Sequence, residues 1–403
     1  MPNRYCARRS RSSASTGSER VAQLVYLISE DWYFRRHFLA LAVAAKEAGH
    51  NVTVCCRLGE HGATAVSQIQ DAGIAVRRID FQRSSLNPWI DCNTRRQIVR
   101  AYSELAPDIV HQIALKPIIH GQYAARRTGV KARVNFLPGF GHAFTSRAVK
   151  AQILKPLISV ALAHALSGET IGLAVMNVDD RNRLAALAGS DPNAVTVVPG
   201  TGVDLSRFAA SPENEGPIVA TFLGRFLQDK GLEELAEAAR ILHQRNCPII
   251  VRLVGAPDPG NPASLPESLL TTWQSEGLVE VEPWTDNVPD VWRDSHIAIL
   301  PSHREGFGMS LAEAAACKRP LVATDVPGCR DAVLNGKTGL LVPPRDPEAL
   351  ANAIGALARD KVRRHAMAVA ARQDAETRLS LERINELVLK LYDNLLNTVA
   401  EGP

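Results

Sequence analysis

Two carboxylates eight positions apart, Glu305 and Glu313, bracket a glycine-containing turn and the start of an alanine-rich helix. An apolar strand is expected just before this turn, at residues 296–300. Free amides at a helix N-terminus and the helix dipole favour an anion, and glycine lets the backbone approach a phosphate. Carboxylates are poor partners for a phosphate, but they accept hydrogen bonds from sugar hydroxyls. The segment therefore predicts a sugar-nucleotide site, and the residues between the carboxylates that we expect to line it are Gly306, Phe307, Gly308, Met309 and Ser310.

The same segment has a purely structural interpretation. Ser310 and Glu313 stand three positions apart and fit a capping box, in which the glutamate only satisfies the first helical turn. Patterns this short recur by chance, so the segment alone leaves both interpretations open.

A basic loop follows another expected strand, residues 218–223, and precedes an acidic helix start. The loop begins at Gly224 and carries Arg225 and Lys230. Open α/β sheets bind ligands at the carboxyl ends of their strands. Two cations placed there can stabilise a departing nucleotide diphosphate without a metal ion. The alternative is a solvated basic loop with no ligand.

These two motifs, G-R-x4-K-G and E-x7-E in that order, resemble those of the retaining GT-B glycosyltransferases of family 4. The resemblance implies an α/β fold with two Rossmann-like, doubly wound parallel-sheet domains facing a cleft. It implies that Glu305 contacts the donor sugar, that Glu313 contacts the nucleotide ribose, and that Arg225 and Lys230 bind the diphosphate. The implied donor substrate is a UDP-sugar. We expect no cofactor and no metal, because no D-x-D motif occurs in the chain.

Other segments narrow the resemblance, namely residues 31–34 with His37, 115–117, 137–145, 176–180 and 255–262. They are similar to bacterial enzymes that add a hexose or N-acetylhexosamine to a sugar linked to undecaprenyl diphosphate. The resemblance implies a lipid-linked glycan as the acceptor. The candidate residues on the acceptor side are Asp31, His37, Lys116, Gly139 and Gly141.

The sequence departs from the family pattern in two places. Family 4 enzymes often carry a catalytic histidine near the position of residues 136–138, and none stands there. His142 is the nearest candidate, with His37 and His111 as others that we expect at strand or helix ends. In addition, an aromatic segment at residues 31–34 replaces the glycine-rich loop that often precedes the first helix, so this loop is expected to serve the acceptor instead of the donor phosphate.

Composition limits the class of protein. The chain has 403 residues, 46% of them hydrophobic and 22% charged, which suits a globular protein of two domains. A net charge of +4 does not indicate a nucleic-acid partner. Seven cysteines without a C-x-x-C pair indicate reduced thiols. No apolar run reaches the ~18 residues that a transmembrane helix needs. We therefore expect a cytoplasmic protein that is at most peripheral on the inner face of the cell membrane.

The elements that position these residues alternate between strand and helix in both halves of the chain, as in parallel doubly wound sheets. The predicted divisions are a disordered basic tail (1–20), an acceptor-binding domain (21–202), a nucleotide-sugar-binding domain (203–380) and a C-terminal helix that crosses back (381–403). A dinucleotide-binding fold would need G-x-G-x-x-G after the first strand, but residues 29–37 contain no glycine. Residues 36–48 are expected to form one amphipathic helix.

Residues 147–166 are mostly apolar and include Lys150 and Lys155. They form either a basic amphipathic helix at a membrane surface or an ordinary core helix. Two other functions also remain open, a sugar-nucleotide epimerase without an acceptor and a glycan-binding protein without catalysis.

Overall fold

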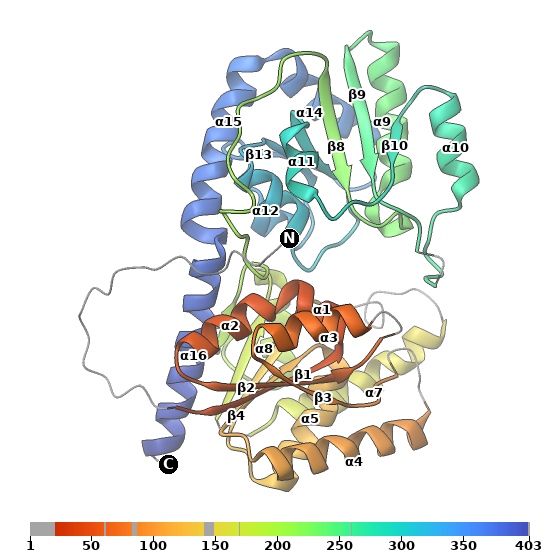
Figure 1. Ribbon diagram of the computed structural model, residues 1–403. Helices are drawn as coiled ribbons and strands as arrows, with labels where there is room; N and C mark the ends of the chain where they lie inside the picture. Colours follow the sequence, from red (N-terminus) through yellow and green to blue (C-terminus); the bar gives the residue numbers. More distant parts are fainter. Residues whose placement is uncertain are drawn as a thin grey trace, which may run out of the picture.

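The computed structural model describes residues 21–59, 62–82, 87–140, 149–168, 170–258 and 260–401. Within them the chain forms two α/β domains, each built on a parallel sheet, which stand one above the other in Figure 1. The predicted class, with two doubly wound parallel sheets, is confirmed. The predicted tail and the last two residues lie outside the described residues.

The N-terminal domain has a seven-stranded sheet in the order β3-β2-β1-β4-β5-β6-β7. Its strands are β1 (Gln23–Glu30), β2 (Asn51–Arg57), β3 (Ala75–Arg78), β4 (Ile109–Ile113), β5 (Ala132–Leu137), β6 (Ile171–Val175) and β7 (Val195–Val197). Its helices are α1 (Asp31–His37), α2 (Leu39–Glu47), α3 (Gly62–Asp71), α4 (Pro88–Leu105), α5 (Leu115–Thr128), α7 (Val149–Leu166), α8 (Val178–Ala188) and the short η1 (Pro192–Ala194). Successive side chains of β1 enter different cores, so the sheet is covered on both faces.

The C-terminal domain has a six-stranded sheet in the order β10-β9-β8-β11-β12-β13. Its strands are β8 (Ile218–Leu223), β9 (Ile249–Val254), β10 (Glu280–Glu282), β11 (Ile297–Leu300), β12 (Leu321–Thr324) and β13 (Gly339–Val342). Its helices are η2 (Gln228–Lys230), α9 (Leu232–Gln244), α10 (Glu267–Ser275), α11 (Val288–Arg293), α12 (Met309–Ala316), α13 (Cys329–Ala332), α14 (Pro347–Arg359), α15 (Lys361–Asp374) and η3 (Ala375–Leu379).

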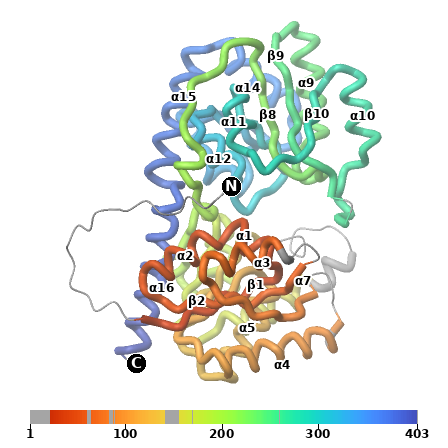
Figure 2. The backbone as a smooth tube through the Cα atoms, in the orientation of Figure 1, coloured from red at the N-terminus to blue at the C-terminus, as the bar shows by residue number. Residues whose placement is uncertain are grey.

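The last helix, α16 (Leu381–Glu401), leaves the C-terminal domain and packs beside α2 and β5 of the other domain (Figures 1 and 2). The hydroxyl of Tyr392 anchors it, 3.0 Å from the hydroxyl of Tyr26 and 2.5 Å from Nδ1 of His111. Burial lowers the pKa of His111 to about 3, so this imidazole is neutral. His111 was expected at a strand or helix end, but it lies in the middle of β4 and its side chain is fully buried in the domain core.

The chain crosses between the domains twice, and the two crossings are hydrogen-bonded to each other. The amide of Val203 donates to the carbonyl of Leu379, and the amide of Leu381 donates to the carbonyl of Val203, each at 2.9 Å. Gly202, with φ +81°, allows this approach, because a Cβ there would lie 2.7 Å from Cα of Leu381. The paired crossings hold the beginning of one domain against the end of the other.

Two local predictions differ from the structure. The aromatic segment that begins at Asp31 is not a loop but the first turn of α1, where an acidic residue suits the helix dipole. The single helix predicted for residues 36–48 is broken at Phe38, whose ring is buried in the core. No helix among the described residues is both long and apolar enough to cross a membrane.

Candidate functional site

The basic loop is the segment 224–231 after β8, and the Glu305 turn is the segment 305–308 that leads into α12. They lie next to each other because β8 and β11 are neighbours in the sheet. Strand order reverses between these two strands, which is where open α/β sheets form a ligand crevice. Gly231, with φ +70°, ends the basic loop, and a Cβ there would lie 2.1 Å from the carbonyl oxygen of Pro301. The amide of His303 donates to the carbonyl of Asp229 at 2.8 Å. The two loops are thus joined through their backbones.

Lys230 and Glu305 form an ion pair at this junction. Nζ of Lys230 lies 2.5 Å from Oε1 of Glu305, and the two side chains are only 20% and 12% exposed. The hydroxyl of Ser302 donates to the same carboxylate oxygen at 2.7 Å. Thr324, at the end of β12, fixes Ser302 by donating to its carbonyl. A cation and a carboxylate are therefore held together at the carboxyl ends of adjacent strands.

Arg225 lies farther out on the same loop and pairs with another residue. Its guanidinium donates to Asp258 at 2.8 Å, and the arginine side chain is 59% exposed. Gly224 and Gly255 bring the ends of β8 and β9 together, since a Cβ on Gly255 would lie 1.9 Å from the carbonyl oxygen of Gly224. Arg225 is therefore paired with Asp258 while most of its side chain faces solvent.

The turn after Glu305 leads directly into α12, whose N-cap is Gly308. Ser310 is thus inside the helix and does not cap it, so the capping-box interpretation is wrong. Phe307 and Met309 turn toward the interdomain linker, because a Cβ on Gly200 would lie 2.6 Å from both side chains. Their side chains serve packing, which leaves the backbone of this turn as the part that can meet a ligand.

Glu313 projects from α12 into a partly buried setting. Burial raises its pKa from 4.5 to about 7, and the positive charges of Arg36 and Arg207 oppose that rise. Arg36 belongs to α1 of the other domain, and its guanidinium lies 4.9 Å from the ring centre of Trp284. Glu313 can therefore accept hydrogen bonds as a carboxylate or donate one as an acid near neutral pH.

The N-terminal domain contacts the Glu305 turn through the backbone of Pro138 and Gly139 and through the side chain of Asn177. A Cβ on Gly306 would lie 2.1 Å from the carbonyl oxygen of Pro138, and Gly139 is packed close to Gly306. Nδ2 of Asn177 donates to the carbonyl of Gly306 at 2.9 Å. Glycine at position 306 is required by this close approach between domains.

The other residues expected on the acceptor side lie within the N-terminal domain. The Asp31 carboxylate is buried and accepts from the amides of Trp32 and Gly59. His37 stacks near Tyr33, and burial lowers its pKa to about 4.

Lys116 donates to the carbonyl of Gln82 at 2.9 Å and pairs with Asp91 at 3.1 Å. Gly141 and His142 lie outside the described residues. None of these acceptor-side assignments is decided by these contacts, and they stay predictions.

Helix α7, which covers most of residues 147–166, has features of both a core helix and a helix with an exposed apolar face. Leu162 and Leu166 are buried in the domain core, whereas Leu157 and Val160 are 65% and 69% exposed. Lys155 is partly exposed, and the side chain of Lys150 lies outside the described set. The helix therefore has a core face and a second face with apolar side chains in solvent.

Three residues of the site region were given no role by the motif analysis, although Asn177 lies within the segment 176–180. Asn177 follows β6, Trp284 follows β10 and Arg36 lies on α1. The signal that points to Asn177 and Trp284 is their position just after a strand, where ligand-facing side chains gather. Nothing local distinguishes Arg36, because its neighbours come from the other domain.

Both halves of the chain match known families. The family described as "Glycosyl transferase 4-like" matches residues 23–167, and "Glycosyl transferases group 1" matches residues 217–360. These ranges fall on the N-terminal and C-terminal domains and include the basic loop and the Glu305 turn in the second.

Two curated relatives are similar over about four fifths of the chain. The N,N'-diacetylbacillosaminyl-diphospho-undecaprenol alpha-1,3-N-acetylgalactosaminyltransferase of Campylobacter jejuni is 26% identical, over 82% of this chain and 89% of the relative. The D-inositol 3-phosphate glycosyltransferase of Kribbella flavida is 29% identical, over 81% and 82%.

Solved structures share the fold. HepE of Anabaena in complex with UDP superposes with a TM-score of 0.72 at 18% identity, covering 92% of this chain and all of that one (100%). Sucrose-phosphate synthase of Thermosynechococcus elongatus gives 0.73 at 20% identity, covering 93% and 99%. The arrangement of the two domains is that of the GT-B glycosyltransferases.

Proposed function

Because this chain is a glycosyltransferase of the GT-B type, we propose that it moves a hexose or N-acetylhexosamine from a UDP-sugar to a lipid-linked glycan with retention of anomeric configuration. The observation that most supports the donor assignment is the pairing of Lys230 with Glu305 at 2.5 Å. This pair brings the basic loop and the Glu305 turn into one site, at the point between β8 and β11 where the strand order reverses.

Each residue of the pair has a distinct role in this proposal. Glu305 accepts hydrogen bonds from hydroxyls of the donor sugar. Lys230, with three N–H donors on its ammonium, can keep one bond to Glu305 while it binds the diphosphate. Arg225 leaves Asp258 and adds a second cation to the diphosphate. The negative charge that develops on the leaving group is thereby stabilised by two cations.

The proposed reaction needs little base from the protein. The bond from the anomeric carbon to the diphosphate oxygen breaks, and an oxocarbenium-like species forms. The acceptor hydroxyl attacks from the face that the diphosphate leaves, and its proton passes to the leaving oxygen. Stabilisation of the diphosphate, which grows in the transition state, is then the main contribution of the protein. No metal is required by this scheme.

The acceptor is proposed from the Campylobacter relative, whose acceptor is a sugar on diphospho-undecaprenol. A lipid-linked acceptor requires that the enzyme work at a membrane surface. The exposed apolar residues Leu157 and Val160 on α7 suit such a contact. We assign this helix to the membrane interface in the proposed function.

A donor screen followed by an acceptor test examines the proposal. Thermal unfolding is measured with UDP, UDP-glucose and UDP-N-acetylgalactosamine, because a ligand that binds the folded state raises the unfolding temperature. UDP release is then measured with and without a diphospho-undecaprenyl-linked sugar, and with EDTA. Release that needs the acceptor and persists in EDTA supports the proposal. Epimerisation without acceptor, or binding without turnover, would refute it, and product NMR reports the anomeric configuration.

A further inference from the structure

Asn177 joins the two domains through a buried side chain that is fully hydrogen-bonded. Its Oδ1 accepts from the amide of Asp180 at 2.7 Å, which caps α8. Its Nδ2 donates to the Asp180 carboxylate at 3.0 Å and to the carbonyl of Gly306 at 2.9 Å. An amide group has two N–H donors, so both are used only while the domains touch as they do here.

The turn that receives this bond is held on other sides as well. Gly306 lies against the carbonyl of Pro138. Gly328, with φ +84°, lies against the carbonyl of Glu305, because a Cβ on Gly328 would be 2.8 Å from that oxygen. We infer that Asn177 is a positioning residue: it makes the orientation of Glu305 depend on contact between the domains. This inference rests on the proposed contact of Glu305 with the donor sugar.

The consequence is a site that is complete only when the domains are together. If they separate, Gly306 loses its interdomain donor, and the backbone that carries Glu305 is released on that side. Correct placement of a reacting group within about 1 Å is worth roughly 10²-fold in rate. Asn177 would therefore restrict efficient transfer to the closed arrangement.

A neighbouring interdomain bond provides the control. Asp179, also on α8, pairs with Arg330 of α13 at 3.0 Å, and both side chains are about half exposed at 48% and 47%. It spans the same two domains but does not bond the Glu305 turn. Exposed ion pairs contribute only ~0–1 kcal/mol, so its loss should matter little.

The test compares Asn177→Ser with Asp179→Asn in the full chain. Serine still caps α8, so the unfolding temperature should stay near that of the wild type. With UDP-N-acetylgalactosamine and the lipid-linked acceptor, Asn177→Ser should lower kcat by roughly 10²-fold, while the Kd for UDP changes by less than about threefold. Hydrogen exchange in the UDP complex should rise across residues 303–311 in Asn177→Ser only.

Unchanged exchange across residues 303–311 in Asn177→Ser, or a wild-type kcat, would overturn the inference. A parallel loss of UDP binding and of unfolding temperature would also overturn it, because it would indicate a structural role alone. Glu305→Gln separates this result from the proposed function. If that variant transfers normally, the role of Glu305 fails, whereas an inactive Glu305→Gln beside a fully active Asn177→Ser rejects only the positioning role.

Discussion

Nζ of Lys230 lies 2.5 Å from Oε1 of Glu305, so the cation proposed for the diphosphate and the carboxylate proposed for the sugar are bonded to each other. They come from loops that are 75 residues apart in the chain. A donor that enters this site must share or replace this bond. In the proposed function, the pair therefore couples binding of the donor sugar to binding of the diphosphate.

Single and double substitution of this pair should have different effects on stability and activity. Lys230→Ala leaves a mostly buried carboxylate without its cation, and such losses cost about 3–5 kcal/mol when burial is complete. Lys230→Ala combined with Glu305→Ala should recover part of that stability. Lys230→Ala, Glu305→Ala and the double variant should each lose transfer by on the order of 10²–10³-fold. Urea unfolding and UDP release measure the two effects, and additive losses of stability would contradict the coupling.

Arg225→Ala should lower transfer by on the order of 10²–10³-fold with little change in stability. Its ion pair with Asp258 is exposed, and such pairs contribute ~0–1 kcal/mol. Asp258→Asn is the matched control, because it removes the same ion pair but leaves the cation. Kinetics and thermal unfolding of both variants provide the measurement. Equal rates for the two variants would remove Arg225 from the site.

Glu313 should make the stability of the protein depend on pH. Its pKa is about 7 in the folded chain and 4.5 ordinarily, so the folded state binds the proton more tightly. The stabilisation by protonated Glu313 is complete below pH 4.5 and is lost as the pH rises through 7. Glu313→Gln cannot ionise, so it should gain roughly 1–3 kcal/mol relative to the wild type between pH 4.5 and pH 8. Urea unfolding of both proteins across this range measures the gain, and a constant difference would contradict the shifted pKa.

The same residue should influence donor binding. The carboxylate form accepts hydrogen bonds from the ribose, so UDP affinity should fall between pH 8 and pH 6 more steeply in the wild type than in Glu313→Gln. UDP itself takes up a proton in this range, which is why the difference between the two proteins is the readout. At pH 8 Glu313→Gln should bind UDP more weakly. Calorimetry at both pH values measures this, and equal affinities would exclude the ribose contact.

The exposed face of α7 should bind membranes. Leu157→Ser with Val160→Ser should reduce binding to anionic liposomes and transfer to a long-chain lipid acceptor, because apolar area at the interface drives such contacts. Transfer to a short water-soluble acceptor should stay normal. Val362→Ser is the control, since Val362 is 82% exposed on α15 of the other domain. Lys150→Glu with Lys155→Glu should act in the same direction. Equal loss on both acceptors would indicate misfolding, and no loss would exclude the membrane role.

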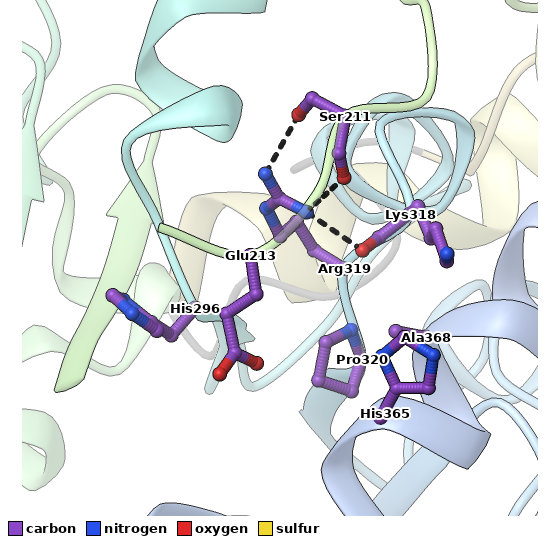
Figure 3. Close-up of a pocket in the computed structure, with 8 residues that line it drawn as sticks. All are labelled: Ser211, Glu213, His296, Lys318, Arg319, Pro320, His365 and Ala368. Atoms are coloured by element: carbon purple, nitrogen blue, oxygen red, sulfur yellow. Dashed lines mark hydrogen bonds between the residues drawn. The ribbon is translucent and has the colours of Figure 1, made fainter. Parts of the chain in front are cut away.

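Figure 3 shows polar residues of the C-terminal domain that lie close together, among them Ser211, Glu213, His296 and Arg319. Arg319 is buried and donates to the carbonyls of Trp292 and Ser211, among others. Glu213 binds Arg364 through both oxygens, and His296 lies beside this pair. Because Arg319 donates to neutral oxygens and Glu213 pairs with Arg364, these contacts hold the segment that enters the C-terminal domain.

The sequence by itself determined the fold class and the places where ligand-facing residues gather. Apolar strand patterns, each followed by a turn rich in glycine or charge, predict which residues stand at the carboxyl ends of strands. That information is local, and it made Arg225, Lys230 and Glu305 candidates, whereas their proposed roles toward a donor come from the family resemblance. It was also sufficient to predict two doubly wound sheets, which the structure confirms.

Tertiary structure alone decided how those residues interact. The bond from Lys230 to Glu305, the raised pKa of Glu313 and the reach of Asn177 across the domains all depend on neighbours distant in sequence. His111 shows the same limit, since only packing of α16 reveals that it is a core residue. Burial and charge act through space, so the polarity and spacing of nearby residues cannot specify them.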